Sequence, residues 1–261
     1  MSAPEAVLTL SGVNKSFGGV QAVSQMTFTV ERGAITGLIG PNGAGKTTIF
    51  NLVTAVYPVD SGDILFKGRS LPGLASHEII RLGIARTFQN LRLFHRSTAL
   101  ENVMTACQRH HPYGFLEALT HGGRWKRTEK AIERRSLELL DRVGLADRAH
   151  QAASTLPYGH QRRLEIARAL ALDPELLLLD EPAAGMNPEE VFALNDLIGA
   201  IHRDFSLTIL VIEHHMDLVM EICPHIVCMN FGAKIAEGGP EDIQNHPEVL
   251  KAYLGEEAVE A

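Results

Sequence analysis

Residues 40–47 are the feature that most limits how this chain can fold. They read Gly-Pro-Asn-Gly-Ala-Gly-Lys-Thr and fit the pattern G-x-x-x-x-G-K-[ST], which holds the phosphates of a nucleotide. Gly43 and Gly45 can adopt backbone angles that other residues avoid, so that successive N–H groups can turn toward an anion. Lys46 supplies a positive charge for the β- and γ-phosphates, and the hydroxyl of Thr47 is a possible ligand of Mg²⁺. The motif, called the phosphate loop below, therefore predicts a nucleotide-binding protein.

The segments on either side of the phosphate loop support this interpretation. Residues 34–39 form an apolar run typical of a buried strand, and residues 47–53 have the pattern of a helix. A helix that begins at the loop directs its positive end toward the phosphates. The expected nucleotide-binding residues are Gly40, Pro41, Asn42, Gly43, Ala44, Gly45, Lys46, Thr47 and Thr48.

Apolar runs and helical patterns alternate over much of the chain. Residues 34–39, 176–179 and 209–212 read as buried strands with helical stretches between them. This alternation predicts an α/β fold whose parallel sheet is covered on both faces. Residues 7–10 and 26–30 read as additional strands near the N-terminus.

From about residue 95 the pattern changes to helix. Thr98 and Glu101 form a capping box at the start of one helix, and residues 128–143 carry apolar side chains at helical spacing. Gly144 is placed to end the second helix. A helical block between two halves of an α/β pattern indicates an inserted subdomain.

Composition narrows the class of protein further. The chain has 261 residues and a formal net charge of -7, which argues against nucleic acid as the main partner. No apolar run approaches the roughly 18 residues that span a bilayer, and there is no signal pattern, so we expect a soluble chain that is not exported. Cys107, Cys223 and Cys228 lack the spacing of metal ligands, which favours a reducing compartment over a disulfide framework or a zinc site.

Four polar residues are expected at the ends of strands, where chemistry gathers in sheets of this class. Asp180 and Glu181 directly follow the strand over residues 176–179, so we expect Asp180 to hold Mg²⁺ and Glu181 to polarise the attacking water. Gln89 is expected to end a short strand, where its amide can bridge the metal and the water. His214 follows the strand over residues 209–212, where its imidazole can contact the γ-phosphate. Surface residues of exposed loops are the alternative interpretation of all four positions.

In their order along the chain, these motifs resemble those of an ABC-type ATPase. The matching segments are the phosphate loop, Gln89, residues 156–160 (Leu-Pro-Tyr-Gly-His), residues 179–182 (Leu-Asp-Glu-Pro) and His214. The resemblance extends from Phe17 to about Gly255. It implies a single cassette over residues 1–261, with a P-loop NTPase core (1–89 and 156–255) and an inserted helical subdomain (90–155). The core would contain a parallel sheet and an N-terminal antiparallel β subdomain.

The same resemblance implies ATP and Mg²⁺ as cofactors and assigns individual roles. Catalysis is assigned to Lys46, Glu181 and His214, and the metal to Thr47, Gln89 and Asp180. Phe17 would stack on adenine, although a simple core aromatic is the alternative interpretation. The signature residues, which would close over the nucleotide of a second ATPase subunit, are Leu156, Pro157, Tyr158, Gly159 and His160. Residues 90–155 would contact a membrane partner.

Several segments resemble more closely the ATPase subunits of branched-chain amino acid importers. They are residues 86–94, 182–188, 212–214 and 252–255, and residues 109–126 resemble the larger, G-type subunit. This resemblance implies an ATP-driven uptake transporter with a second ATPase subunit, in a heterodimer or a homodimer. Two permease subunits and, indirectly, a substrate-binding protein would complete it. The chain would lie peripherally on the cytoplasmic face of the inner or plasma membrane.

Other functions remain open at this point. The same ATPase could serve the uptake of urea or other amides, or the export of lipopolysaccharide. A soluble ABC protein acting on nucleic acid or ribosomes is a further alternative, because basic residues cluster between Arg124 and Arg135. That cluster can equally be a solvated helix face or a patch beside lipid headgroups or a membrane subunit.

Three positions depart from the general pattern of the ABC family. Pro157 replaces the signature serine, Asn187 replaces an aspartate, and His215 replaces the aspartate that usually follows the switch histidine. Pro157 offers neither a hydroxyl nor an N–H, but it suits the first turn of a helix. We therefore expect the signature helix to persist, and the site that it completes in a heterodimer to be the slower one.

Overall fold

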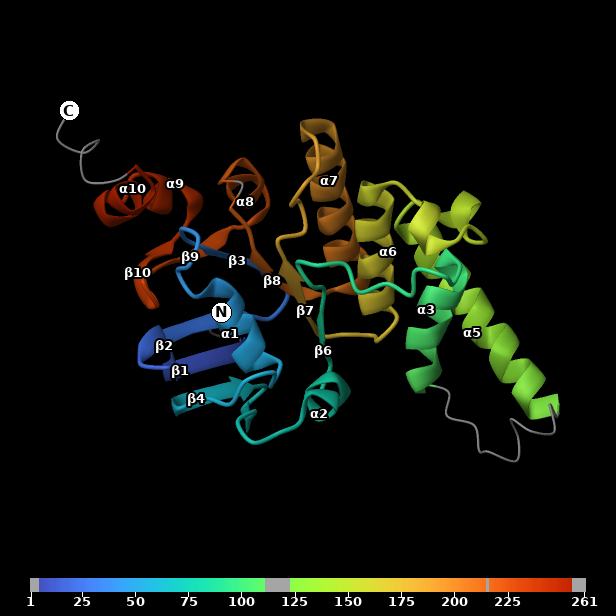
Figure 1. Ribbon diagram of the computed structural model, residues 1–261, viewed down its shortest axis with the longest axis horizontal. Helices are drawn as coiled ribbons and strands as arrows, with labels where there is room; N and C mark the ends of the chain where they lie inside the picture. The colour runs from blue at the N-terminus through green and yellow to red at the C-terminus, as the bar shows by residue number, and fades with distance from the viewer. Residues whose placement is uncertain (1–4, 111–122, 215, 255–261) are drawn as a thin grey trace. The chain divides into compact units, whose positions relative to one another are not determined.

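The computed structural model describes residues 5–110, 123–214 and 216–254 (Figure 1). Two compact units are distinguished by their contacts. The first, called the core unit, comprises Met1–Arg86 and Glu175–Ala261; the second, called the helical unit, comprises Thr87–Pro174. His215, Gly255 and residues 111–122 of the expected 109–126 segment lie outside the described residues.

A six-stranded sheet with the order β10-β9-β3-β8-β7-β6 lies at the centre of the core unit. Its strands are β3 (Ile35–Ile39), β6 (Ile84–Arg86), β7 (Leu176–Asp180), β8 (Thr208–Ile212), β9 (His225–Asn230) and β10 (Ala233–Gly238). All neighbouring pairs are parallel except β9 and β10. Every residue of β3, β7 and β8 is buried, because elements cover both faces of a parallel sheet. The predicted parallel sheet is therefore confirmed.

A smaller antiparallel sheet has the order β2-β1-β4-β5. Its strands are β1 (Ala6–Phe17), β2 (Val20–Glu31), β4 (Ser61–Phe66) and β5 (Arg69–Ser70). The alternation of apolar side chains along β1 and β2 directs Leu8, Leu10 and Phe28 into a core that also includes Phe50. This sheet is the antiparallel β subdomain that the sequence led us to expect.

The helices of the core unit are α1 (Lys46–Val53), α2 (Ser76–Arg81), α7 (Pro188–Phe205), α8 (Met216–Ile222), α9 (Pro240–Gln244) and α10 (Pro247–Leu254). Asn187, one of the three departures, is the N-cap of α7. Its Oδ1 accepts a hydrogen bond from the Glu190 N–H at 2.9 Å, and the Glu190 carboxylate accepts one from the Asn187 N–H at 3.1 Å. An amide oxygen caps a helix as well as a carboxylate oxygen does, so asparagine preserves this end of α7.

The helical unit contains α3 (Ala99–Cys107), α5 (Gly123–Arg142) and α6 (Tyr158–Leu170), with short 3-10 turns at Gln108–His110, Ala146–Arg148 and Ala153–Thr155. The predicted capping box is present, since the Thr98 hydroxyl accepts from the Glu101 N–H at 3.1 Å. Helix α6 packs against α3 and α5, so the unit extends to Pro174 and includes the signature residues. It is thus longer than the expected segment of residues 90–155.

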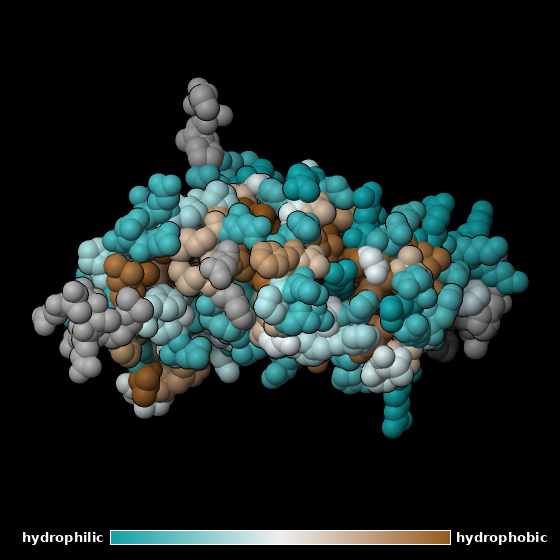
Figure 2. Space-filling model, turned by 90° about the horizontal axis from the view of Figure 1, so that it is seen from above, coloured by the Kyte–Doolittle hydropathy of each residue, from teal (hydrophilic) through white to brown (hydrophobic). Residues whose placement is uncertain are grey.

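Hydrophilic side chains predominate on one face of the chain. On the face shown in Figure 2, hydrophobic side chains form scattered groups among hydrophilic ones. In the parts of the chain that the structure describes, no helix is both long enough and apolar enough to cross a membrane. The three cysteine thiols are free and buried, and burial raises the pKa of Cys223 and of Cys228 to about 12.

Candidate nucleotide-binding site

The phosphate loop connects the end of β3 to the start of α1, and two of its glycines are fixed by close backbone approaches. A Cβ atom at Gly40 would lie 2.2 Å from the Met229 carbonyl oxygen, and one at Gly45 would lie 2.3 Å from the Ala22 carbonyl oxygen. Both glycines also have positive φ values, of 150° and 102°. No residue with a side chain fits either position, because the backbone of β9 at Met229 and of β2 at Ala22 leaves no room.

Lys46 is the first residue of α1 and is buried. Its Nζ donates hydrogen bonds to the carbonyl oxygens of Gly40, at 2.6 Å, and Pro41, at 3.0 Å. Burial lowers the pKa of Lys46, and the nearby carboxylate of Glu181 partly opposes this shift. The loop therefore holds a cation in a partly desolvated place, where its attraction for an anion is stronger than in bulk water.

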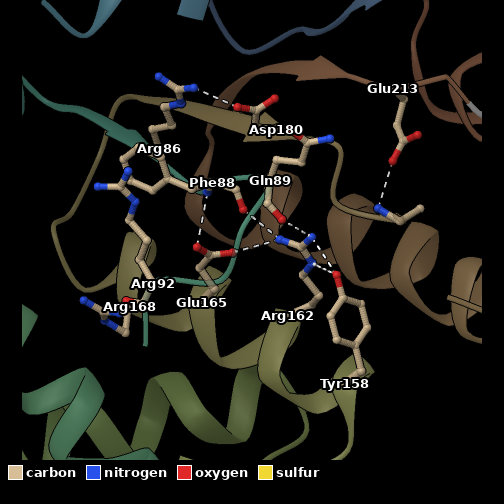
Figure 3. A network of polar contacts seen from close by, with 11 residues as sticks. Arg86, Phe88, Gln89, Arg92, Tyr158, Arg162, Glu165, Arg168, Asp180 and Glu213 are labelled. Carbon is tan, nitrogen blue, oxygen red and sulfur yellow. Dashed lines mark hydrogen bonds and ion pairs between the residues drawn. The ribbon is translucent and has the colours of Figure 1, made fainter. Parts of the chain in front are cut away.

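Asp180 ends β7, and its carboxylate is anchored by an arginine on the neighbouring strand. Arg86 Nη2 lies 2.7 Å from Asp180 Oδ2, and both side chains are almost completely buried (Figure 3). The guanidinium also donates to Asn51 Oδ1, at 2.8 Å, and to Thr54 Oγ1, at 3.2 Å. Arg86 thus links β6 and β7 to the region of α1. Sequence analysis gave this arginine no role, although its position at the end of a strand that pairs with β7 was the available signal.

Glu181 and His214 follow adjacent parallel strands and lie close together. His214 Nδ1 is 3.9 Å from Glu181 Oε2. The backbone of Glu181 has a φ of 46°, a left-handed conformation that costs a residue with a side chain roughly 1–2 kcal/mol. A hydrogen bond of 2.9 Å from its N–H to the Ile212 carbonyl oxygen holds it there. The strand ends therefore bring together the predicted catalytic carboxylate and the predicted switch histidine.

Glu213 connects the loops that carry these two residues. Its fully buried carboxylate accepts one hydrogen bond from the Ala183 N–H, at 2.8 Å, and another from the His214 N–H, at 3.0 Å. A buried carboxylate that accepts backbone hydrogen bonds stabilises the loops that donate them. Glu213 was not predicted as a functional residue, because its bonds depend on the two strands lying side by side.

Gln89 belongs to the helical unit and does not end a strand, so that prediction was wrong. Strand β6 stops at Arg86. The Phe88 N–H donates to the Glu165 carboxylate at 3.2 Å, and the Phe88 carbonyl oxygen accepts from Arg162 at 2.7 Å. These side chains of α6 occupy the backbone groups that a neighbouring strand would otherwise have bonded.

Phe17 lies at the end of β1 with 40% of its surface exposed, so it is not a core aromatic. Its ring packs edge to face against Tyr57, with ring centroids 5.0 Å apart and an interplanar angle of 71°. Tyr57 is also 40% exposed and was not singled out from the sequence. Two exposed aromatic rings in contact form a surface suited to stacking with a flat ligand.

The signature residues form the start of α6. Leu156 is buried, Pro157 is the N-cap, and the helix begins at Tyr158. The Gln161 N–H donates to the Pro157 carbonyl oxygen at 3.0 Å. The helix therefore forms without the usual serine, as expected for a proline at this end. Tyr158 is 41% exposed, whereas Gly159 is buried.

Comparisons with known proteins agree with this geometry. The family described as ABC transporter matches residues 23–184, which is more than half of the chain. The chain belongs to the ABC transporter ATP-binding family. A second family, described as branched-chain amino acid ATP-binding cassette transporter, matches residues 233–259.

Named relatives of this cassette match it over nearly its full length. The high-affinity branched-chain amino acid transport ATP-binding protein BraF of Pseudomonas aeruginosa is 46% identical over 98% of this chain and 100% of its own. LivG of Escherichia coli, named as the same kind of protein, is 43% identical over the same shares. A probable LivG of Archaeoglobus fulgidus is 37% identical over 95% of each chain.

Solved structures show the same cassette fold. The ADP conformation of an ATP-binding cassette of an ABC transporter superposes with a TM-score of 0.84 and 28% identity, over 97% of this chain and 100% of that one. A nucleotide-free cassette superposes with a TM-score of 0.81 and 29% identity, with the same coverage. The chain is an ABC ATPase, and nucleotide binding follows from its family.

Two arginines of the basic cluster lie beside acidic side chains. Arg134 and Arg135 lie 3.9 Å and 3.8 Å from the Glu138 carboxylate, and Arg135 also pairs with Asp173 at 3.1 Å. Such interleaved charges are typical of a solvated helix face.

Proposed function

We propose that this cassette is the ATP-hydrolysing subunit of an importer for branched-chain amino acids. The main support is its similarity to BraF and LivG over nearly the whole chain, including the C-terminal region where a family of branched-chain amino acid cassettes matches. Glu181 and His214, which we propose for hydrolysis, follow the adjacent strands β7 and β8, and this placement supports the proposal.

In this proposal the core unit binds and hydrolyses ATP. The phosphate loop and Lys46 hold the β- and γ-phosphates, and Phe17 stacks on the adenine. Glu181 orients the attacking water and accepts its proton, and His214 contacts the γ-phosphate. The hydrogen bonds from the Ala183 and His214 N–H groups to Glu213 support this assignment, because they hold the backbone beside both proposed catalytic residues.

The chemistry of the site suits Mg²⁺. The Thr47 hydroxyl and the Asp180 carboxylate are hard oxygen ligands, and Gln89 adds an amide oxygen. Among the described residues, no cluster of three or more His, Cys, Asp or Glu side chains could hold a metal alone. This agrees with a metal held by few protein ligands together with phosphate oxygens. When bound, Mg²⁺ supplies charge neutralisation for the transferred phosphoryl group.

The proposed partners follow from the same assignment. The signature residues act on the nucleotide of a second ATPase subunit, in a heterodimer or a homodimer. Two permease subunits receive the motion, with a substrate-binding protein delivering the cargo on the other side of the membrane. The cassette would lie on the cytoplasmic face. Exposed Arg92 and Arg96, in the helical unit just after Gln89, are proposed for the contact with the permease.

Purification from detergent-solubilised membranes tests this proposal. The tagged cassette is expected to retain two hydrophobic permease subunits, and the reconstituted complex is expected to take up leucine, isoleucine and valine with ATP. Uptake of urea or other amides instead, or export of lipopolysaccharide, would contradict the proposed cargo. Release of nucleic acid by salt, without permease subunits, would contradict the proposed transport role.

A further inference from the structure

A single buried arginine in the helical unit bonds to two separate functional segments. The guanidinium of Arg162 donates from Nη1 to the Phe88 carbonyl oxygen, at 2.7 Å, and from Nη2 to the Gln89 carbonyl oxygen (Figure 3). Its Nε and Nη2 also donate to the Tyr158 hydroxyl, at 3.1 Å and 2.8 Å. Tyr158 is a signature residue, and Gln89 is the residue proposed to bridge metal and water. One side chain therefore connects the start of the signature helix to the backbone of Gln89.

Glu165 completes this arrangement from the next turn of α6. Its carboxylate lies 3.3 Å from Arg162 Nη1, accepts from the Phe88 N–H at 3.2 Å, and also accepts from the Arg92 N–H. The Arg162 and Glu165 side chains are only 3% and 6% exposed. All three nitrogens of the guanidinium are thus engaged in a dry place, where breaking any one bond leaves a buried polar group without its partner.

The chain just before this segment is fixed in the core unit instead. Arg86, the last residue of that part of the core unit, is held by Asp180, Asn51 and Thr54. Phe88, two residues later, is held by Arg162 and Glu165. Between the two sets of bonds lies only Thr87, at which the boundary between the units falls.

We propose that Arg162, oriented by Tyr158 and Glu165, is a positioning residue that fastens residues 88–92 to the signature helix. Gln89 and the signature are then held together within the helical unit, and Thr87 alone separates these bonds from those that hold Arg86. The tyrosine in the altered signature thereby has a role of its own. Its ring is exposed at the signature surface, while its hydroxyl holds the arginine that carries Gln89.

A consequence for regulation follows, and it rests on the proposed function. A nucleotide of the second subunit that covers the signature would restrain Tyr158, and through Arg162 it would restrain the Gln89 backbone. Each ATP would then influence the glutamine that serves the other. Lysine cannot replace Arg162 in this role, because it lacks the planar fork that reaches two carbonyl oxygens and a hydroxyl together.

Hydrogen exchange on the isolated full chain tests the fastening independently of transport. In Arg162→Gln, amides of residues 88–92 should exchange roughly tenfold faster or more, as expected for the loss of hydrogen bonds to a charged group. Arg162→Lys should resemble Arg162→Gln, and Tyr158→Phe should show a smaller increase. Arg134→Gln is the matched control, because Arg134 is 79% exposed and lies on α5. Wild-type exchange in Arg162→Gln would overturn the proposal, and Tyr158→Phe decides it if the arginine variants do not fold.

Stimulation of ATP hydrolysis in the assembled transporter tests whether Arg162 positions Gln89 or only stabilises the fold. With leucine-loaded binding protein, Arg162→Gln should lose roughly tenfold in the stimulated rate while the Kd for ATP changes by less than about twofold. Stimulation equal to wild type in Arg162→Gln would overturn the positioning role. If the wild-type complex itself shows no stimulation by any branched-chain amino acid, the proposed function fails, while the hydrogen-exchange result still decides the fastening.

Discussion

In the core unit, Glu181 and His214, which are proposed for catalysis, follow strands whose every residue is buried. In the helical unit, Gln89 lies beyond the end of β6, its carbonyl oxygen accepts from Arg162, and Glu165 accepts from the N–H of the neighbouring Phe88. The first arrangement derives its precision from the backbone of a parallel sheet. The second derives it from a buried charge pair. The difference indicates that the core can keep its geometry through many side-chain changes, while the helical unit depends on a few polar residues.

The largest effect is expected at Arg86. Like Arg162 in the helical unit, Arg86 is a buried charge, but it lies in the core unit and tests whether that unit also depends on polar side chains. Arg86→Met leaves the Asp180 carboxylate buried without its ion-pair partner, and removing one partner of a buried pair typically costs about 3–5 kcal/mol. We expect the free energy of unfolding, measured with urea, to fall by that amount. Arg134→Met should change it by less than about 0.5 kcal/mol. The double variant Arg86→Met with Asp180→Leu should recover part of the loss, and no recovery would show that Arg86 acts through other contacts.

Glu181 tests whether chemistry resides in the core unit. In Glu181→Gln the side chain keeps its shape but can no longer accept a proton, so ATP hydrolysis should fall by roughly 100-fold or more. The thermal midpoint should change little. Glu189→Gln, on the exposed first turn of α7, is the matched control and should hydrolyse ATP normally. A loss much smaller than 100-fold in Glu181→Gln would contradict its assignment as the general base.

The altered signature predicts that the two nucleotide sites of a heterodimer hydrolyse ATP at different rates. Pro157 removes one or two bonds to the partner's nucleotide, each worth about 10- to 150-fold in affinity or rate. The site containing Lys46 and Glu181 of this chain should therefore dominate turnover, provided that the partner's signature keeps its serine. Substituting the catalytic glutamate of each subunit in turn by glutamine should produce the larger loss in this chain. Equal losses, or a larger loss in the partner, would contradict this expectation.

Arg92 and Arg96 test whether the helical unit carries coupling and not chemistry. Reversing either charge, as in Arg92→Glu or Arg96→Glu, should reduce leucine transport on the order of tenfold by weakening the contact with the permease. The affinity for ATP should stay within about twofold of wild type, because the phosphate loop belongs to the core unit. A collapse of ATP affinity would show that these residues serve the active site.

The smallest expected effect is a dependence of stability on pH. Burial raises the pKa of Glu165, against the opposing effect of its hydrogen bonds and of Arg162. The folded chain then binds this proton more tightly than the unfolded chain does, so stability should fall as the pH rises from about 4.5 through the folded pKa. This fall is measured as the difference in the free energy of urea unfolding between pH 4.5 and pH 8. Glu165→Gln should remove it, while Glu138→Gln should not.

Much of the core unit could be predicted from the sequence, because its determinants are local. The phosphate loop, Asp180 and Glu181 are recognised from spacing and from the apolar run before them, and the parallel sheet follows from the length of such runs. The contacts that were missed join distant positions. Arg162 bonds to carbonyl oxygens 73 and 74 residues earlier, and Glu213 bonds to an N–H 30 residues earlier.

The error at Gln89 has the same origin. Apolar and β-branched residues on both sides of Arg86 favour a strand that continues to Gln89, but strand pairing ends at Arg86. The backbone beyond that point is bonded by α6, whose polar side chains gave no signal of their partners. The end of a strand is therefore difficult to predict where side chains can bond the backbone as well as a neighbouring strand can.

The three buried cysteines make the difference between the two units measurable in one labelling reaction. Cys107 lies in the helical unit, and Cys223 and Cys228 lie in the core unit. With a pKa of about 12, each core thiol is a thiolate in only about one molecule in 10⁵ at pH 7. An alkylating reagent can therefore modify these thiols appreciably only when the surrounding structure opens. The order in which the three cysteines react would show which unit opens first, and no cysteine needs to be introduced for the measurement.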